Sequence, residues 1–128
     1  MKTIPKWISS PEIYSLILVK CGINMSLDNW KQKRIKSLSY IDLSENEISG
    51  SPAWFDLGKL KSFSKTLKTL DLSRNLVFGR VSETVAGVKK INLRQNHLCG
   101  KLRVTKFQAS VFTSNDCLCS SPLPPCKT

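Results

Sequence analysis

One short pattern recurs along the chain and constrains its fold more than any other feature. Residues 38–50 recur closely as residues 67–79, a third copy spans residues 88–100, and a looser copy spans residues 13–23. Measured between Cys21, Asn46, Asn75 and Asn96, consecutive copies are 25, 29 and 21 residues apart. A unit this short cannot bury its own apolar side chains, so the copies must stack into a solenoid with one continuous core.

Each copy follows the template L-x-x-L-x-L-x-x-N/C-x-L, which is typical of leucine-rich repeats. The alternation in Leu-x-Leu places apolar side chains on one face, as in a short strand with one buried side. We therefore predict an α/β solenoid, a right-handed superhelix of leucine-rich repeats. Short parallel β-strands should form the concave face, with 3₁₀, short helical and loop segments on the convex face.

The Asn/Cys position follows the second leucine of each strand, where the chain must turn. A side-chain amide there can satisfy inward-facing backbone groups that the turn leaves unpaired. We therefore expect a structural role for the turn residues Cys21, Asn46, Asn75 and Asn96. A small thiol is a tolerated substitute at this position, so Cys21 is predicted to be buried, unpaired and inert.

Composition and charge narrow the class of protein. The 128 residues carry a formal net charge of +11, and no run of apolar residues is long enough to cross a membrane. The start of the chain has no convincing signal peptide, because Pro5, Pro11 and Glu12 interrupt the apolar residues and the repeat accounts for them. No cofactor is expected.

The C-terminal region holds four of the five cysteines, namely Cys99, Cys117, Cys119 and Cys126. An even set in a segment rich in serine and proline is typical of an extracellular domain stapled by disulfides. Four cysteines alone allow three pairings. Zinc bound by these cysteines or His97 is the alternative, but paired Cys-x₂-Cys knuckles are missing, so we expect no metal.

The tail from Asn96 to Lys127 resembles the C-terminal cap of plant polygalacturonase-inhibiting proteins and related secreted or receptor-like leucine-rich repeat proteins. It contains Cys117-Leu-Cys119-Ser-Ser-Pro122-Leu-Pro124-Pro-Cys126-Lys127. The resemblance implies disulfides Cys99–Cys117 and Cys119–Cys126, with Phe107 and Phe112 covering the last coil. It divides the chain into about four repeats over 1–103, the first partial, and a disulfide-stapled cap over 104–128. Such proteins have roughly ten repeats, so the chain reads as a truncated member.

The same resemblance implies a non-enzymatic recognition module of the plant cell wall and defence, located outside the cell. The partner would be a protein, such as a secreted polygalacturonase or a receptor-like protein, or an acidic cell-wall polysaccharide. In a solenoid, the residues between the leucines line the concave face and bind partners. The candidate binding residues are Tyr40, Asp42, Lys68, Asp71, Arg74, Lys89, Lys90, Asn92 and Arg94. Their basic members could attract an acidic polymer or an acidic protein face.

Several alternatives remain open. The basic segment 31–36 could be a nuclear-import or nucleic-acid patch, but no nucleic-acid-binding fold accompanies it, so no nucleic-acid partner is predicted. Asn24-Met-Ser26 is an N-glycosylation sequon. The single histidine, His97, has no nucleophile motif beside it, and Asp42 with Asp71 are better explained as repeat features than as catalytic acids. A receptor-like ectodomain fragment, or a degenerate structural fragment without a ligand, is the alternative to an inhibitor-like module.

Overall fold

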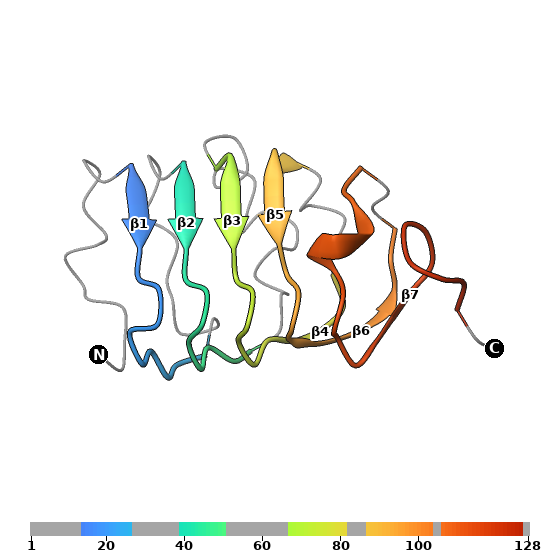
Figure 1. The fold of residues 1–128 in the computed structure, drawn as a ribbon, viewed down its shortest axis with the longest axis horizontal. Helices are drawn as coiled ribbons and strands as arrows, with labels where there is room; N and C mark the ends of the chain where they lie inside the picture. The colour runs from blue at the N-terminus through green and yellow to red at the C-terminus, as the bar shows by residue number, and fades with distance from the viewer. Residues whose placement is uncertain (1–13, 27–38, 51–66, 82–86, 104–105, 127–128) are drawn as a thin grey trace.

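The computed structural model describes residues 14–26, 39–50, 67–81, 87–103 and 106–126. Its main sheet has four parallel strands, ordered β1 (Ser15–Ile17), β2 (Tyr40–Asp42), β3 (Thr69–Asp71) and β5 (Lys90–Asn92). Figure 1 shows these strands side by side in chain order, one from each copy of the repeat. The predicted leucine-rich repeat solenoid is therefore confirmed.

The strands pair in the register that the repeat template predicts. Leu16 pairs with Ile41, Ile41 with Leu70, and Leu70 with Ile91. All four side chains are buried, whereas their neighbours in each strand are exposed or half-buried. Each strand thus sends one side chain inward and two outward, as strand geometry requires.

A second parallel sheet, which the sequence did not predict, forms along one flank. It consists of β4 (Phe78–Gly79), β6 (His97–Lys101) and β7 (Cys117–Cys119), in the order β4-β6-β7. An isolated parallel bridge between Ser26 and Ser49 belongs to the same flank. The flank follows the turn in each coil, so each coil contributes to two hydrogen-bonded ladders.

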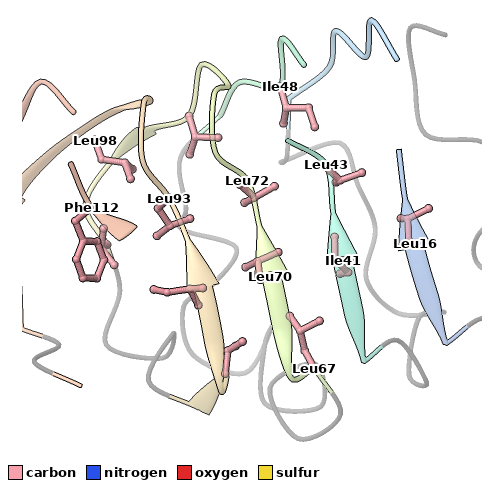
Figure 2. Packing of buried hydrophobic residues seen from close by; sticks show 14 of the residues in the cluster. Leu16, Ile41, Leu43, Ile48, Leu67, Leu70, Leu72, Leu93, Leu98 and Phe112 are labelled. Atoms are coloured by element: carbon pink, nitrogen blue, oxygen red, sulfur yellow. The ribbon is translucent and has the colours of Figure 1, made fainter. Parts of the chain in front are cut away.

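The core runs between the main sheet and the connecting segments. Figure 2 shows equivalent leucines and isoleucines from successive coils stacked in a row, with Phe112 at the C-terminal end. Ile41, Leu43, Leu70 and Leu72 have no exposed surface. This continuous stack is the burial that no single coil could achieve.

The turn asparagines form a ladder that joins neighbouring coils. The side-chain Oδ1 of Asn46 accepts hydrogen bonds from the backbone N–H groups of Cys21 and Ile23, at 2.9 and 3.0 Å. Its Nδ2 donates to the backbone carbonyls of Leu18, Leu43 and Ser44. Asn75 and Asn96 repeat this pattern one and two coils further on. All three are buried, so each amide satisfies polar groups that water cannot reach.

The backbone turns through the left-handed region immediately before each of these positions. Lys20, Glu45, Arg74, Gln95 and Ser114 have φ angles of 53°, 58°, 57°, 56° and 61°. Non-glycine residues rarely adopt this conformation. Its recurrence in every described coil shows that the turn geometry belongs to the fold and not to one residue type.

Gly100 has a positive φ of 111°. A Cβ atom there would lie 3.1 Å from Cγ of Arg80 in the preceding coil. Only glycine combines this backbone angle with so close an approach.

The prediction that Cys21 is buried is wrong. Its thiol is free, as predicted, but the residue is only half-buried, and Sγ lies 3.5 Å from the carbonyl oxygen of Val19. A thiol has no amide to bond both coils, and the backbone N–H of Cys21 is itself bound by Asn46. Cys21 packs against the edge of the core without joining the asparagine ladder.

The C-terminal cap continues the coil register beyond β5. Leu93 N–H donates to the carbonyl of Val111 at 2.8 Å, and Gln95 N–H to that of Thr113 at 3.0 Å, as in the preceding coils. The short 3₁₀ helix η6 (Ala109–Val111) thereby takes the place of a fifth strand, and Figure 1 shows it beside β5.

The cysteines pair as Cys99–Cys117 and Cys119–Cys126, the pairing that the family resemblance implied. The first disulfide joins β6 to β7, whose cysteines are also register partners. Together the two bridges tie the end of the chain to the last coil.

We expect the first bridge to stabilise the fold more than the second, because it closes a longer loop. The sequence separations are 18 and 7 residues. Replacing Cys99 and Cys117 by serine should lower the free energy of unfolding by about 3 kcal/mol, and replacing Cys119 and Cys126 by about 2 kcal/mol. Urea denaturation of the two double variants measures both values. An equal or reversed order would contradict a loop-closure origin of the stability.

Some predictions fall outside the described residues. These include the basic segment 31–36, most of the convex connections, and residue 104, the first residue of the predicted cap. In the part of the chain that the structure describes, no helix is long and apolar enough to span a membrane.

Candidate functional site: the concave face

The predicted binding residues come together on and around the main sheet. Tyr40, Asp42, Asp71, Lys90 and Asn92 belong to the strands and flank the inward-facing residues, so they point to the concave side. Lys68 and Lys89 immediately precede β3 and β5 at one rim. Arg74 and Arg94 follow the same strands at the opposite rim.

The two aspartates of this face are engaged within their own coils. Oδ1 of Asp42 accepts hydrogen bonds from the backbone N–H and the hydroxyl of Ser44, at 3.1 and 2.7 Å. Asp71 makes the same pair of bonds to Ser73, at 2.9 and 2.6 Å. Both carboxylates close the turn after the strand, as expected for a repeat feature. We therefore assign these two aspartates a structural role and not a role in ligand binding.

Arg74 is also held by neighbouring coils. Its guanidinium forms an ion pair with Glu45 in the preceding coil, and its Nε donates to Oε1 of Gln95 in the following coil at 2.7 Å. The guanidinium thus bridges three successive turns. Its charge is balanced by Glu45, so Arg74 contributes less to an anion-binding surface than its sequence position suggested.

The remaining basic residues form an unbalanced cluster at the C-terminal end of the face. Lys68, Lys89, Lys90 and Arg94 are all exposed. None of the four forms an ion pair with another residue that the structure describes. We call them the basic end of the concave face. Their charges are free to attract an acidic partner.

The opposite end of the same face is apolar, and Tyr40 is its one member among the candidate binding residues, although the template places the others on the concave face as well. Tyr14, Ile17, Val19 and Tyr40 are exposed by 65%, 59%, 39% and 39%. They come from β1, β2 and the residues beside β1. We call them the apolar end. The signal was present in the sequence, because Tyr14, Ile17 and Val19 occupy outward positions of the first copy.

The concave face is therefore divided along the solenoid axis. Three strand steps separate β1 from β5, which at the usual spacing is about 14 Å. A protein partner of ordinary size spans this distance easily. Exposed tyrosine and isoleucine are side chains that can provide apolar contact area, and the lysines and Arg94 are side chains that can attract negative charge.

The described residues show no catalytic constellation. Nδ1 of His97 lies 3.1 Å from Oδ1 of Asp116, but both side chains are more than half exposed and lie on the flank. No hydrogen bond joins His97 to a serine, a threonine or the free cysteine within the described ranges. These ranges also contain no group of three or more His, Cys, Asp or Glu placed to hold a metal ion.

Comparison with known proteins agrees with this architecture. The family model described as Leucine Rich Repeat matches residues 37–57. Polygalacturonase inhibitor 2 of Arabidopsis thaliana is 34% identical over 98 residues, which cover 72% of this chain and 28% of that protein. Receptor-like protein EIX1 of Solanum lycopersicum is 31% identical over 106 residues, covering 80% of this chain and 10% of the relative. The chain thus spans less than a third of the length of these two relatives.

Solved structures show the same fold. The crystal structure of a plant ice-binding protein has a TM-score of 0.65 and 27% sequence identity, with 84% of this chain and 35% of that chain aligned. The BIR3–SERK2 complex from Arabidopsis thaliana has a TM-score of 0.60 and 22% identity, covering 90% of this chain and 74% of that one. The chain belongs to the leucine-rich repeat proteins, and within them it is similar to plant polygalacturonase inhibitors and receptor-like proteins.

Proposed function

We propose that this chain is a non-enzymatic recognition module that binds a protein through its concave face, and that the protein is a polygalacturonase whose activity it inhibits. The observation that carries the proposal is the division of this face into an apolar end and a basic end. The similarity to polygalacturonase inhibitors supplies the class of partner. The two disulfides support a location outside the cell, where such bridges persist.

The apolar end favours a protein over an acidic polysaccharide as the main ligand. A polyuronate is hydrophilic and charged throughout, so it would engage the basic end and leave Ile17 and the two tyrosines exposed to water. A protein surface can cover both ends, since interfaces combine apolar anchors with charged margins. Binding of the polysaccharide alone would therefore leave the apolar end without a partner.

Replacing three of the four residues of the basic end should weaken binding. The binding that remains should depend less on salt concentration. In the Lys89→Ser/Lys90→Ser/Arg94→Ser variant we expect the dissociation constant for a polygalacturonase to rise about tenfold or more at low salt, because several complementary charges are lost. Biolayer interferometry at two salt concentrations measures this change. The matched control is Lys101→Ser, which removes an exposed charge from β6 on the flank. Equal weakening by the control would contradict the assignment.

Polar substitutions at the apolar end should have a second, salt-independent effect. We expect Ile17→Ser to weaken the same complex about tenfold, since a 59% exposed isoleucine can contribute an apolar anchor. Leu76→Ser is the control, because Leu76 is 44% exposed outside the main sheet. If Ile17→Ser leaves the affinity for the polygalacturonase unchanged, the apolar end does not contact the enzyme.

A receptor-like role is the second candidate, supported by the similarity to receptor-like protein EIX1. In that role the concave face would bind a receptor or peptide and would not inhibit an enzyme. An assay of polygalacturonase activity separates the two. If the polygalacturonase loses activity when the chain is added, the inhibitor role is supported. If the enzyme binds the chain and keeps its full activity, recognition without inhibition is supported.

A further inference from the structure

The residues after the first turn contain a sequence motif for N-glycosylation on the flank. Asn24 is exposed, between the fully buried Ile23 and the half-buried Met25. Asn24-Met-Ser26 is the single Asn-x-Ser/Thr sequence in the 128 residues. Asn46, Asn75 and Asn96 differ from Asn24 on both counts, since they are buried and lack the motif. Asn24 alone therefore combines the motif with an accessible amide.

The local backbone holds this segment in an extended form. Glu47 N–H donates to the carbonyl of Ile23 at 2.8 Å, and Ser49 N–H donates to that of Met25 at 2.9 Å. Ser26 and Ser49 form a parallel bridge. In this ladder Asn24 lies next to Glu47, and both side chains are exposed. Among the residues that the structure describes, none forms a hydrogen bond with the Asn24 side chain.

We infer that Asn24 is an N-glycosylation site, and that its glycan stands on the flank, away from the concave face. The donor is an oligosaccharide linked through pyrophosphate to a lipid. Nδ2 of Asn24 forms the new bond to C1 of the first sugar, the bond between C1 and the pyrophosphate oxygen breaks, the amide loses one proton, and the lipid pyrophosphate leaves. This inference rests on the extracellular location in the proposed function.

The position of the glycan makes it compatible with partner binding. Asn24 follows the turn, whereas the binding residues of its coil, Tyr14, Ile17 and Val19, lie in or beside β1. A buried residue, Ile23, separates the glycan from the turn. The glycan should therefore cover the flank near Glu47 and leave the main sheet open.

The test uses the full chain directed into the endoplasmic reticulum of leaf cells by an appended leader, followed by intact-mass analysis and peptide mapping. We expect a mass increase of one oligosaccharide, and enzymatic release should convert residue 24 to aspartate. Ser26→Ala should abolish the increase, while Ser26→Thr should keep it because threonine preserves the motif. Ser49→Ala, the matched serine of the next coil, should have no effect. A chain that is exported without a glycan would overturn the site.

Two further measurements separate the site from the proposed function. The Asn24→Gln variant should bind polygalacturonase with the affinity of the unchanged chain, and a change of tenfold or more in either direction would overturn the placement of the glycan away from the binding face. Analysis of the protein from its own tissue tests the location. A glycan on the leader-directed chain but none on the tissue protein would leave Asn24 as an acceptor and overturn the extracellular part of the proposal.

Discussion

Replacing Phe112 by alanine should lower the free energy of unfolding by about 3–5 kcal/mol, the largest loss that we expect from any single side chain of the cap. Phe112 is 1% exposed and closes the C-terminal end of the leucine stack (Figure 2). Its ring meets that of Phe107 edge to face, with centroids 6.4 Å apart. Removing the ring leaves a cavity at the end of the core and exposes the apolar side chains of the last coil to water. Urea denaturation followed by circular dichroism measures the loss.

Phe107→Ala is the matched control for this prediction. Phe107 packs against the core but is only half-buried, so its removal deletes the edge contact without opening the end of the core. We expect less than half of the effect of Phe112→Ala. If both variants lose the same stability, the cap does not depend on the burial of Phe112.

Asn96→Ala should cost about 3–4 kcal/mol, because it leaves several buried backbone groups without partners. The Asn96 side chain accepts a hydrogen bond from Val77 N–H at 3.0 Å. It donates to the backbone carbonyls of Leu72, Leu93 and Arg94. These bonds join two coils, so the variant should also unfold less cooperatively. Denaturant titration gives both the free energy and the slope of the transition.

Asn92→Ala provides a control with the same substitution in the same coil. Asn92 is half-buried, and its side chain accepts one hydrogen bond, from Arg94 N–H at 3.2 Å. We expect a loss of about 1 kcal/mol or less. A loss equal to that of Asn96→Ala would show that the asparagine ladder does not carry the stability assigned to it.

The main sheet was predictable from the sequence because apolar residues recur at the same position in each copy of the repeat. Leu16, Ile41, Leu70 and Ile91 occupy one template position, and the structure pairs them in register. The ladder positions Asn46, Asn75 and Asn96 follow from the same template. Such positions are predictable because burial leaves few residue types that can satisfy a turning backbone.

The repeat template did not predict the structure of the cap. Asn115 belongs to the ladder, since it accepts a hydrogen bond from Leu98 N–H at 3.0 Å and donates to the carbonyl of Leu93 at 3.0 Å. The template did not identify it because Phe112 replaces the leucine three residues earlier. An aromatic side chain there suits the end of a core, where no further coil must stack.

The sequence predicted which strands form the candidate binding face, but not which of its residues are free to contact a partner. Residue type alone gave weight to charged residues such as Asp42 and Arg74, which the structure shows bound to Ser44, Glu45 and Gln95. Exposure gives weight instead to Ile17 and Tyr14, which the template had placed on the outward side but which were not chosen as candidate binding residues. Contacts between coils depend on side-chain geometry that no single-coil pattern encodes. The ligand itself is not specified by the fold.

Chemical footprinting of lysines tests the central claim most directly. The full chain is treated with an amine-reactive reagent, alone and with a polygalacturonase, and each lysine is quantified by mass spectrometry. Binding through the concave face predicts that Lys68, Lys89 and Lys90 lose reactivity in the complex while Lys101, on the flank, keeps its own. Protection of Lys101 with the other three unchanged, or the failure of any complex to form, would contradict the account.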